Sequence, residues 1–194
     1  MRSDMSDKLI HFTKGDDEES AYQNLRSIIA QRTIWGSHNL IKGAHVCVCF
    51  SEAPLASLQN GLQNSDFYSK YSLFGILTSK EHVFSLGGRP VIYQPDSEYG
   101  QLTCENNWRH MRYEPPQTDL SWEREWRLKT EGFQLEASVT AIIVPDTDWE
   151  QRLIADDEKH QRWQTMQYSQ IMEETLAVQY EESFPWTVIP LNSP

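Results

Sequence analysis

Two carboxylates and an arginine occur close together in Asp119–Lys129, which reads DLSWEREWRLK. Alternate side chains of a β-strand point to the same face, so a strand here would place Glu123, Glu125 and Arg127 together. Two carboxylates on one face can divide the work of glycosidic chemistry. One stabilises a sugar cation while the other orients or deprotonates the attacking group. An exposed strand with ordinary cross-strand ion pairs would show the same pattern.

Two other short motifs carry hydrogen-bonding side chains. His11 and Thr13 alternate in the apolar segment Lys8–Thr13, so a strand would bring both to one face, where they could hold a ligand. Ser51 follows the β-rich run AHVCVCF at the point where a loop begins, a common place for functional groups. The same residues have simpler explanations. His11 could be a buried histidine whose ring is hydrogen-bonded, Thr13 a hydroxyl at the end of a strand, and Ser51 part of an ordinary turn.

Several enzyme classes are not indicated. The sequence has no GxxxxGK phosphate loop, no dinucleotide glycine fingerprint, no GxSxG nucleophile elbow and no HExxH zinc motif. Cys47, Cys49 and Cys104 are too few and too unevenly spaced for a disulfide framework or a zinc site. We therefore expect no bound metal.

The net charge of −11 is unevenly distributed over the 194 residues. Residues 131–194 hold 3 basic and 12 acidic groups, whereas residues 68–130 hold 8 of each. A globally acidic chain binds nucleic acid poorly in a nonspecific way. The balanced charge of residues 68–130 is still compatible with a local neutral or basic groove. The start of the sequence has no apolar signal region and no run is long enough to span a bilayer, which predicts a soluble cytoplasmic protein.

The elements expected from the hydrophobic pattern are mostly short strands. We predict strands over residues 8–13, 44–51, 69–78, 90–94, 137–144 and 186–189, with one over 119–129 that carries the carboxylates. We predict helices over residues 17–31, 55–62, 80–86, 104–113, 146–153 and 158–179. Strands outnumber helices and do not alternate with them regularly, which predicts a single mixed α+β domain over residues 1–194.

Taken in order, these motifs resemble the ADP-ribosyltransferase fold. A first strand with H-x-T, an amphipathic helix, a strand ending in F-S and a late E-x-E strand are typical of it. The H-F-T of His11–Thr13 is also similar to the first strand of DarT-type DNA-modifying toxins. The set HFT, CFSE, GGRPVIY and WEREWR resembles bacterial abortive-infection proteins over residues 8–130.

The resemblance implies a central split β-sheet over residues 8–145, a helical C-terminal part over residues 146–194, and NAD as the substrate. Glu125 would bind the ribose 2′-hydroxyl and stabilise the cation left when nicotinamide departs, and Glu123 would orient or deprotonate the acceptor. Arg127 would meet the pyrophosphate and Tyr71 would stack on a ring. The cofactor contacts expected in this way are His11, Thr13, Ser51, Tyr71 and Arg127.

A toxin or anti-phage defence effector of this kind would modify a macromolecule, either nucleic acid or protein, and an antitoxin or regulator could control it. No membrane partner is expected. Two other classes stay open on the residues alone. One is a non-catalytic nucleotide- or partner-binding module of the same fold, and the other is a nuclease that holds magnesium with Glu123, Glu125 and Asp119.

Overall fold

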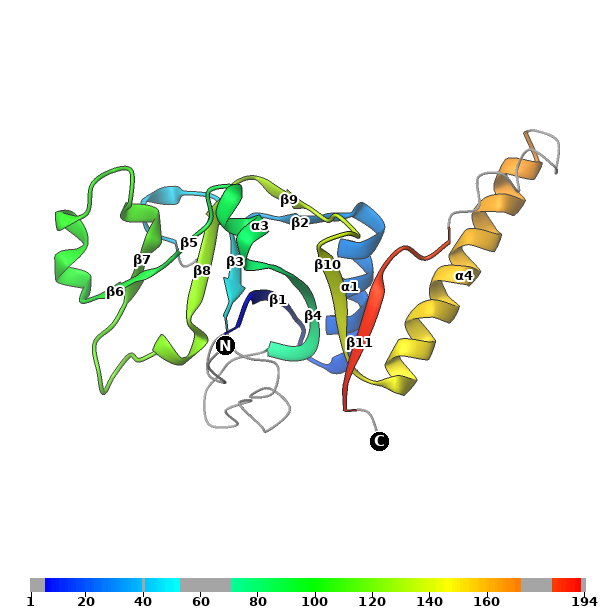
Figure 1. Ribbon diagram of the computed structural model, residues 1–194, viewed down its shortest axis with the longest axis horizontal. Helices are drawn as coiled ribbons and strands as arrows, with labels where there is room; N and C mark the ends of the chain where they lie inside the picture. The colour runs from blue at the N-terminus through cyan, green and yellow to red at the C-terminus, as the bar shows by residue number, and fades with distance from the viewer. Residues whose placement is uncertain (1–5, 40, 53–70, 172–182, 193–194) are drawn as a thin grey trace.

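A seven-stranded, mostly antiparallel sheet is the centre of the computed structural model, which describes residues 6–39, 41–52, 71–171 and 183–192 (Figure 1). The strand order is β11-β10-β4-β1-β3-β8-β5, and only β10 and β11 run parallel to each other. The strands are β1 (Lys8–Lys14), β3 (Cys47–Ser51), β4 (Tyr71–Ser79), β5 (Arg89–Pro90), β8 (Glu125–Lys129), β10 (Thr140–Asp146) and β11 (Thr187–Asn192).

Two small sheets and three helices complete the described structure. One small sheet pairs β2 (Thr33–Trp35) with β9 (Gly132–Gln134), and the other pairs β6 (Ile92–Gln94) with β7 (His110–Arg112). The α-helices are α1 (Glu18–Gln31), α3 (Lys80–Ser85) and α4 (Thr147–Ser169). Short 3-10 segments are η1 (Lys42–Ala44), η2 (Asp96–Gln101), η3 (Asn107–Arg109) and η4 (Ser121–Glu123).

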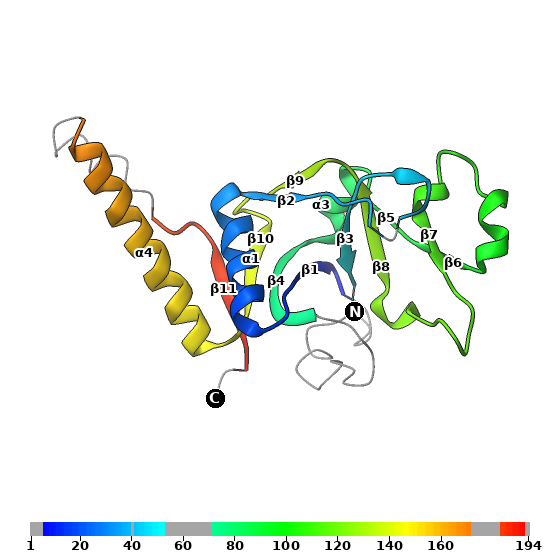
Figure 2. The same ribbon diagram turned by 180° about the vertical axis from the view of Figure 1, so that it is seen from behind.

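The first helix, α1, begins at a capping box. The Asp17 side chain accepts a hydrogen bond from Ser20 N at 2.7 Å, and Ser20 Oγ accepts one from Asp17 N at 3.1 Å. Ala21, Leu25 and Ile29 then recur every fourth residue and are buried, as an amphipathic helix requires. This apolar stripe packs α1 onto β1 and β4 (Figure 2).

The main hydrophobic core lies between the sheet and the helices α1 and α4. Tyr22 of α1, Phe74 of β4 and Trp149 of α4 meet there, with ring centroids 4.9–5.8 Å apart. The other face of the sheet carries a smaller apolar cluster of Ile10, Leu77, Ile143 and Leu191. The sheet therefore separates two sets of side chains, and the face that each residue occupies is decided by strand register.

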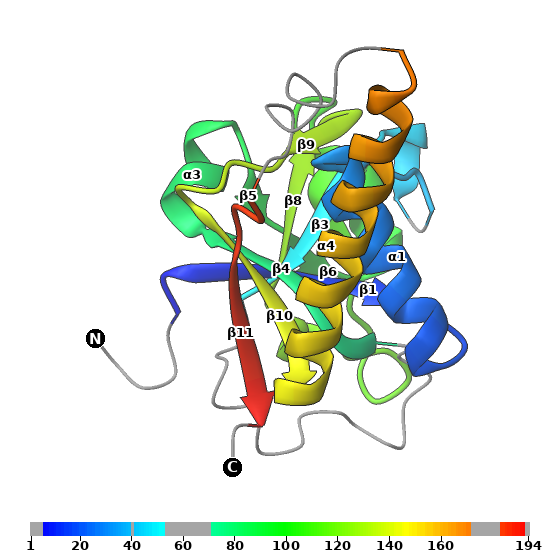
Figure 3. The same cartoon turned by 90° about the vertical axis from the view of Figure 1, so that its right-hand side faces the viewer.

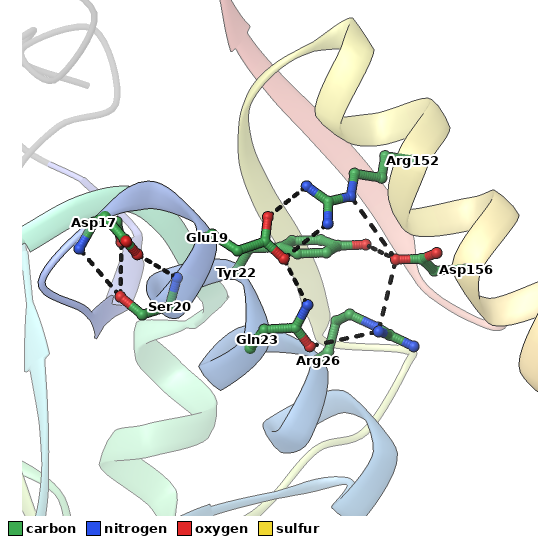
Figure 4. A network of polar contacts seen from close by, with 8 residues as sticks. All are labelled: Asp17, Glu19, Ser20, Tyr22, Gln23, Arg26, Arg152 and Asp156. Carbon is green, nitrogen blue, oxygen red and sulfur yellow. Dashed lines mark hydrogen bonds and ion pairs between the residues drawn. The ribbon is translucent and has the colours of Figure 1, made fainter.

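Helix α4 runs beside α1 and the β10–β11 edge (Figure 3). A polar network joins the two helices (Figure 4). Tyr22 Oη donates to Asp156 Oδ2 at 2.8 Å, and the Arg152 guanidinium donates to both carboxylate oxygens of Glu19 at 2.7 and 2.8 Å. The same guanidinium lies 4.5 Å from the Tyr22 ring centroid and 4.8 Å from that of Trp149. The network fixes the N-terminal half of α4 against the core.

The predicted α+β class is confirmed, and most predicted strands and the first helix are present with shifted ends. The strand predicted over residues 119–129 is wrong before Glu125, since Ser121–Glu123 forms η4 and Arg124 has a left-handed φ of 44°. The helix predicted over residues 104–113 is replaced by η3 and β7. The helix predicted over residues 55–62 lies outside the described residues.

The C-terminal region also differs from the prediction. The helices expected over residues 146–153 and 158–179 are one continuous helix as far as Ser169, and residues 172–182 lie outside the described part. The sheet does not end at residue 145, because β11 pairs with β10. Residues 146–194 are therefore not purely helical. None of the helices in the described part combines the length and the apolar content that crossing a bilayer requires.

Candidate functional site

Three motifs that are far apart in the sequence lie on adjacent strands of the main sheet. β3, which ends in Ser51, pairs on one side with β1 and on the other with β8. Ser51 stands directly opposite Glu125, and Ser51 Oγ donates to the backbone carbonyl of Glu123 at 2.6 Å. The structure therefore brings Ser51 to the segment that carries Glu123 and Glu125.

The turn before β8 places Glu123. Because Arg124 adopts a left-handed conformation, Glu123 does not share a strand face with Glu125 by simple alternation. Tyr93 Oη bridges the turn: it accepts a hydrogen bond from Glu125 N at 3.1 Å and donates to Leu120 O at 3.4 Å. The phenol thus fixes both ends of the segment that carries the two glutamates.

The protonation of Glu123 is tuned by its surroundings. Burial raises its pKa to about 7, and the negative charge of Glu125 acts in the same direction. The positive charges of Lys14 and Arg127 oppose this shift. A carboxyl group with a pKa near 7 can both accept and release a proton at neutral pH, which is the property required of a general acid or base.

Glu125 and Arg127 form a buried ion pair. Arg127 Nε donates to Glu125 Oε1 at 2.8 Å, and Nη2 lies 3.4 Å from Oε2. Arg127 Nη1 donates to the carbonyls of Trp108 and His110, both at 2.8 Å, and Arg127 is only 1% exposed. The expectation that Arg127 meets a pyrophosphate is therefore wrong for this arrangement, because its guanidinium is buried and bonded within the protein.

His11 and Thr13 lie apart from the glutamate pair. Residues directly opposite each other in antiparallel strands share a face, so the register Ile10–Ser51–Glu125 puts Ile10 on the glutamate face and His11 on the other. The His11 ring lies 6.1 Å from the ring of Phe50, in the main core, and Nδ1 is 2.8 Å from Cys49 O. Burial lowers the pKa of His11, and the Cys49 carbonyl opposes this.

Thr13 is also part of the core. It is 3% exposed, and its hydroxyl donates to Phe74 O at 3.2 Å. The structure thus does not bring His11 and Thr13 to the pocket wall predicted for them, because their faces are fixed by the register of β1. Tyr71 is the first residue of β4 and pairs with Lys14, and its side chain lies outside the described part. Its stacking role stays a prediction.

Two neighbours of Glu125 lie outside the predicted set of site residues. One is Tyr93, which competes with Tyr71 and Tyr99 for the tyrosine position that the resemblance implies and which lies in the short strand after the Gly87-Gly88 turn. The other is Cys49 on β3: burial raises the pKa of its thiol, and the charge of Glu125 adds to this effect. The Cys49 thiol is thus kept neutral, so it does not add a second negative charge beside Glu125.

A nuclease site built on three carboxylates is not supported by their placement. Asp119 is exposed, and it accepts hydrogen bonds from Ser121 N and Ser121 Oγ at 3.0 and 2.6 Å. Within the described ranges, no group of three or more His, Cys, Asp or Glu side chains is placed to hold a metal ion.

Comparison of the chain with protein-family models, with curated proteins and with solved structures gives no match. The functional argument therefore depends on the residues and their geometry.

Proposed function

We propose that the protein is an NAD-dependent ADP-ribosyltransferase that modifies a macromolecule, as a toxin or anti-phage defence effector. The observation that carries the proposal is the pair Glu123 and Glu125, in which Glu123 has a pKa of about 7 and Glu125 is paired with a guanidinium. Two neighbouring carboxyl groups held in different environments are typical of sites that need one charge stabiliser and one proton carrier. The pairing of β3 with β8, which sets Ser51 opposite Glu125, also supports it.

In the proposed reaction, the bond between the nicotinamide nitrogen and the ribose breaks, and its electron pair leaves with nicotinamide. The negative charge of Glu125 stabilises the oxocarbenium-like sugar that develops. An acceptor hydroxyl or amine then bonds to the anomeric carbon, and Glu123 takes the proton that the acceptor loses. Ser51 holds the Glu123 carbonyl, so its part is to position the turn.

The test is incubation of the purified protein with NAD labelled in its adenylate half, together with cell protein, RNA and DNA. We expect label on one of these polymers. Glu123→Gln removes the proton acceptor and should lower the rate about 10²- to 10⁴-fold. Glu125→Gln should abolish transfer, and Glu136→Gln, at an exposed site on another loop, should leave it unchanged.

One observation favours a second candidate, a module that binds the nucleotide without turnover. Glu125 is 7% exposed, and its carboxylate is engaged by Arg127. Retained NAD binding with neither labelling nor nicotinamide release, across all acceptors, would support this module and contradict the transferase. An unchanged rate in Glu125→Gln would contradict the assigned site.

A further inference from the structure

An open hollow of about 430 Å³ lies beside α3 and β8, on the side of β8 that carries Trp126. Glu125 faces the other side of that strand, so the hollow is separate from the glutamate pair. Two aromatic residues line it, Phe84 and Trp126, together with the polar side chains of Asp7, Ser79, Lys80 and Glu81. A hollow of this size, with aromatic walls and a few polar groups, suits a small planar ligand.

Phe84 is the exposed wall of this hollow. Its side chain is 52% exposed, so part of the ring is accessible to a ligand. The Arg89 guanidinium carbon lies 4.0 Å from the ring centroid and covers one face of the ring. The part of the ring that remains exposed borders the hollow, where it can stack on a second planar group.

Arg89 lies against this ring and belongs to β5, the edge strand of the sheet, and Arg109 of η3 bonds to the neighbouring residue Pro90. Arg89 donates through Nη1 to the carbonyls of Phe84 and Gly88, at 3.0 and 2.7 Å. Arg109 donates through Nε to Pro90 O at 2.9 Å, and through Nη1 to Asn106 Oδ1 at 3.3 Å. Each guanidinium therefore keeps donors that bond to no described residue.

The two arginines also lack a carboxylate partner among the described residues, although the chain is strongly acidic. Other described arginines do have one: Arg26, Arg112, Arg127, Arg152 and Arg162. Burial lowers the pKa of Arg109, and the positive charge of Arg89 acts in the same direction. Two neighbouring cations that repel each other, and that have spare donors and no counter-charge among the described residues, make a favourable position for an anion.

We propose that Phe84, Arg89 and Arg109 form a nucleotide-binding surface, with an aromatic base stacked on Phe84 in the hollow and the attached phosphate at the two guanidinium groups. Asp7 and Glu81 on the rim can accept hydrogen bonds from the exocyclic amino group of a base. A free nucleotide and a single-stranded nucleic acid share this chemistry. The proposal does not depend on the transferase function, because the base would bind in the hollow, on the face of β8 opposite to Glu125.

Fluorescence anisotropy of the full chain with a labelled single-stranded decanucleotide, and competition by GMP, guanosine and polyglutamate, test the surface. We expect GMP to compete better than guanosine, because only GMP carries the phosphate. Binding of the decanucleotide far more tightly than GMP assigns the surface to a polynucleotide. Comparable affinities assign it to a free nucleotide.

Two variants and two matched controls locate the binding. Phe84→Ala removes the stacking face and should weaken binding about tenfold or more. Arg109→Ala should weaken binding and reduce its dependence on salt concentration by about one phosphate contact. Trp163→Ala and Arg162→Ala remove an exposed aromatic and an exposed arginine on α4, and we expect no effect of either. Circular dichroism melting of each variant checks that it is folded.

Four results would overturn the proposal. The first is that neither the decanucleotide nor GMP binds at millimolar concentration, and the second is that GMP and guanosine bind with equal affinity. The third is that polyglutamate competes as strongly as GMP. The fourth is that the variants and their α4 controls lose the same amount of binding affinity. Polyglutamate competition would show that charge alone attracts the probe. Equal losses would place binding away from Phe84 and Arg109.

Discussion

Glu123 carries a carboxyl group that the fold holds in an unfavourable place for its charge, since burial and then the charge of Glu125 raise its pKa to about 7. A raised pKa means that the folded state binds the proton more tightly than the unfolded chain does. Proton binding at Glu123 makes its full contribution to the free energy of unfolding at pH values below the ordinary pKa of glutamate. It is lost as the pH rises through about 7.

Replacing Glu123 with glutamine should therefore change stability in a pH-dependent way. We expect Glu123→Gln to match the original protein at pH 5 and to be about 1–2 kcal/mol more stable at pH 8, where the charged carboxylate is removed. Urea unfolding at pH 5, 6, 7 and 8 measures the difference. Glu136→Gln, at an exposed position, is the control. A difference that is equal at pH 5 and pH 8 would show that Glu123 does not carry this titration.

Arg127 is a structural partner in the same region, and its loss should be costly. Arg127→Met leaves Glu125 buried without its counter-charge and frees the carbonyls of Trp108 and His110. We expect a loss of about 3–5 kcal/mol in the free energy of unfolding. Arg162→Met, which breaks an exposed pair with Glu158, should cost less than about 0.5 kcal/mol. Similar losses in the two variants would mean that the buried pair is not structural.

The contact between α1 and α4 combines an aromatic cluster with exposed ion pairs, and the two contributions differ in size. Tyr22→Ala removes the ring that packs against both Phe74 and Trp149, for which we expect a loss of about 3–5 kcal/mol. Arg152→Ala breaks a partly exposed pair with Glu19 and should cost about 1 kcal/mol.

Salt separates these two contributions. In 1 M sodium chloride the loss caused by Arg152→Ala should shrink, because exposed charges are screened, whereas the loss caused by Tyr22→Ala should persist. Thermal or urea unfolding of both variants at low and high salt measures this. A loss in Arg152→Ala that is as large as that in Tyr22→Ala would show that charge, rather than packing, holds α4.

Elements with a clear periodicity could be predicted from the sequence. Ala21, Leu25 and Ile29 identify α1, and the apolar residues of β4 and β10 identify those strands. The predicted ends of strands were wrong where a single backbone angle decides them, as at Arg124, whose left-handed φ precedes β8. The strand predicted over residues 137–144 continues past Val144, so Pro145 lies within β10. Pairing with β4 stops at Ile143, so Pro145 lies on a local edge where proline is tolerated.

The long polar helix is a second case in which pattern and packing differ. The helix predicted over residues 158–179 carries Trp163, Met166 and Ile171 at helical spacing, and they are 57%, 65% and 78% exposed. Periodicity predicts which residues share a face, but it does not show whether anything covers that face. The helix itself could therefore be predicted, and the exposure of its C-terminal half could not.

Across the whole molecule, the sequence predicted that strands carrying chemical motifs would form one mixed domain, and it could not supply their order or register. Strand register explains which of the predicted site residues lie together. Glu125 and Ser51 are directly opposite each other, while His11, one residue from the partner of Ser51, faces the core. A shift of one residue in a strand exchanges its two faces, and no local pattern in Lys8–Thr13 distinguishes them, because both faces carry apolar residues.

The central place of β1 also determines how the sheet can assemble during synthesis. β1 leaves the ribosome before its partners β3 and β4, and the whole of α1 separates it from both. In the finished sheet β8 and β5 lie beyond β3 on one side of β1, and β10 and β11 lie beyond β4 on the other. Pairings of such long sequence separation are typical of proteins that fold in milliseconds to seconds. We therefore expect β1 to remain unpaired until β3 or β4 has been synthesised.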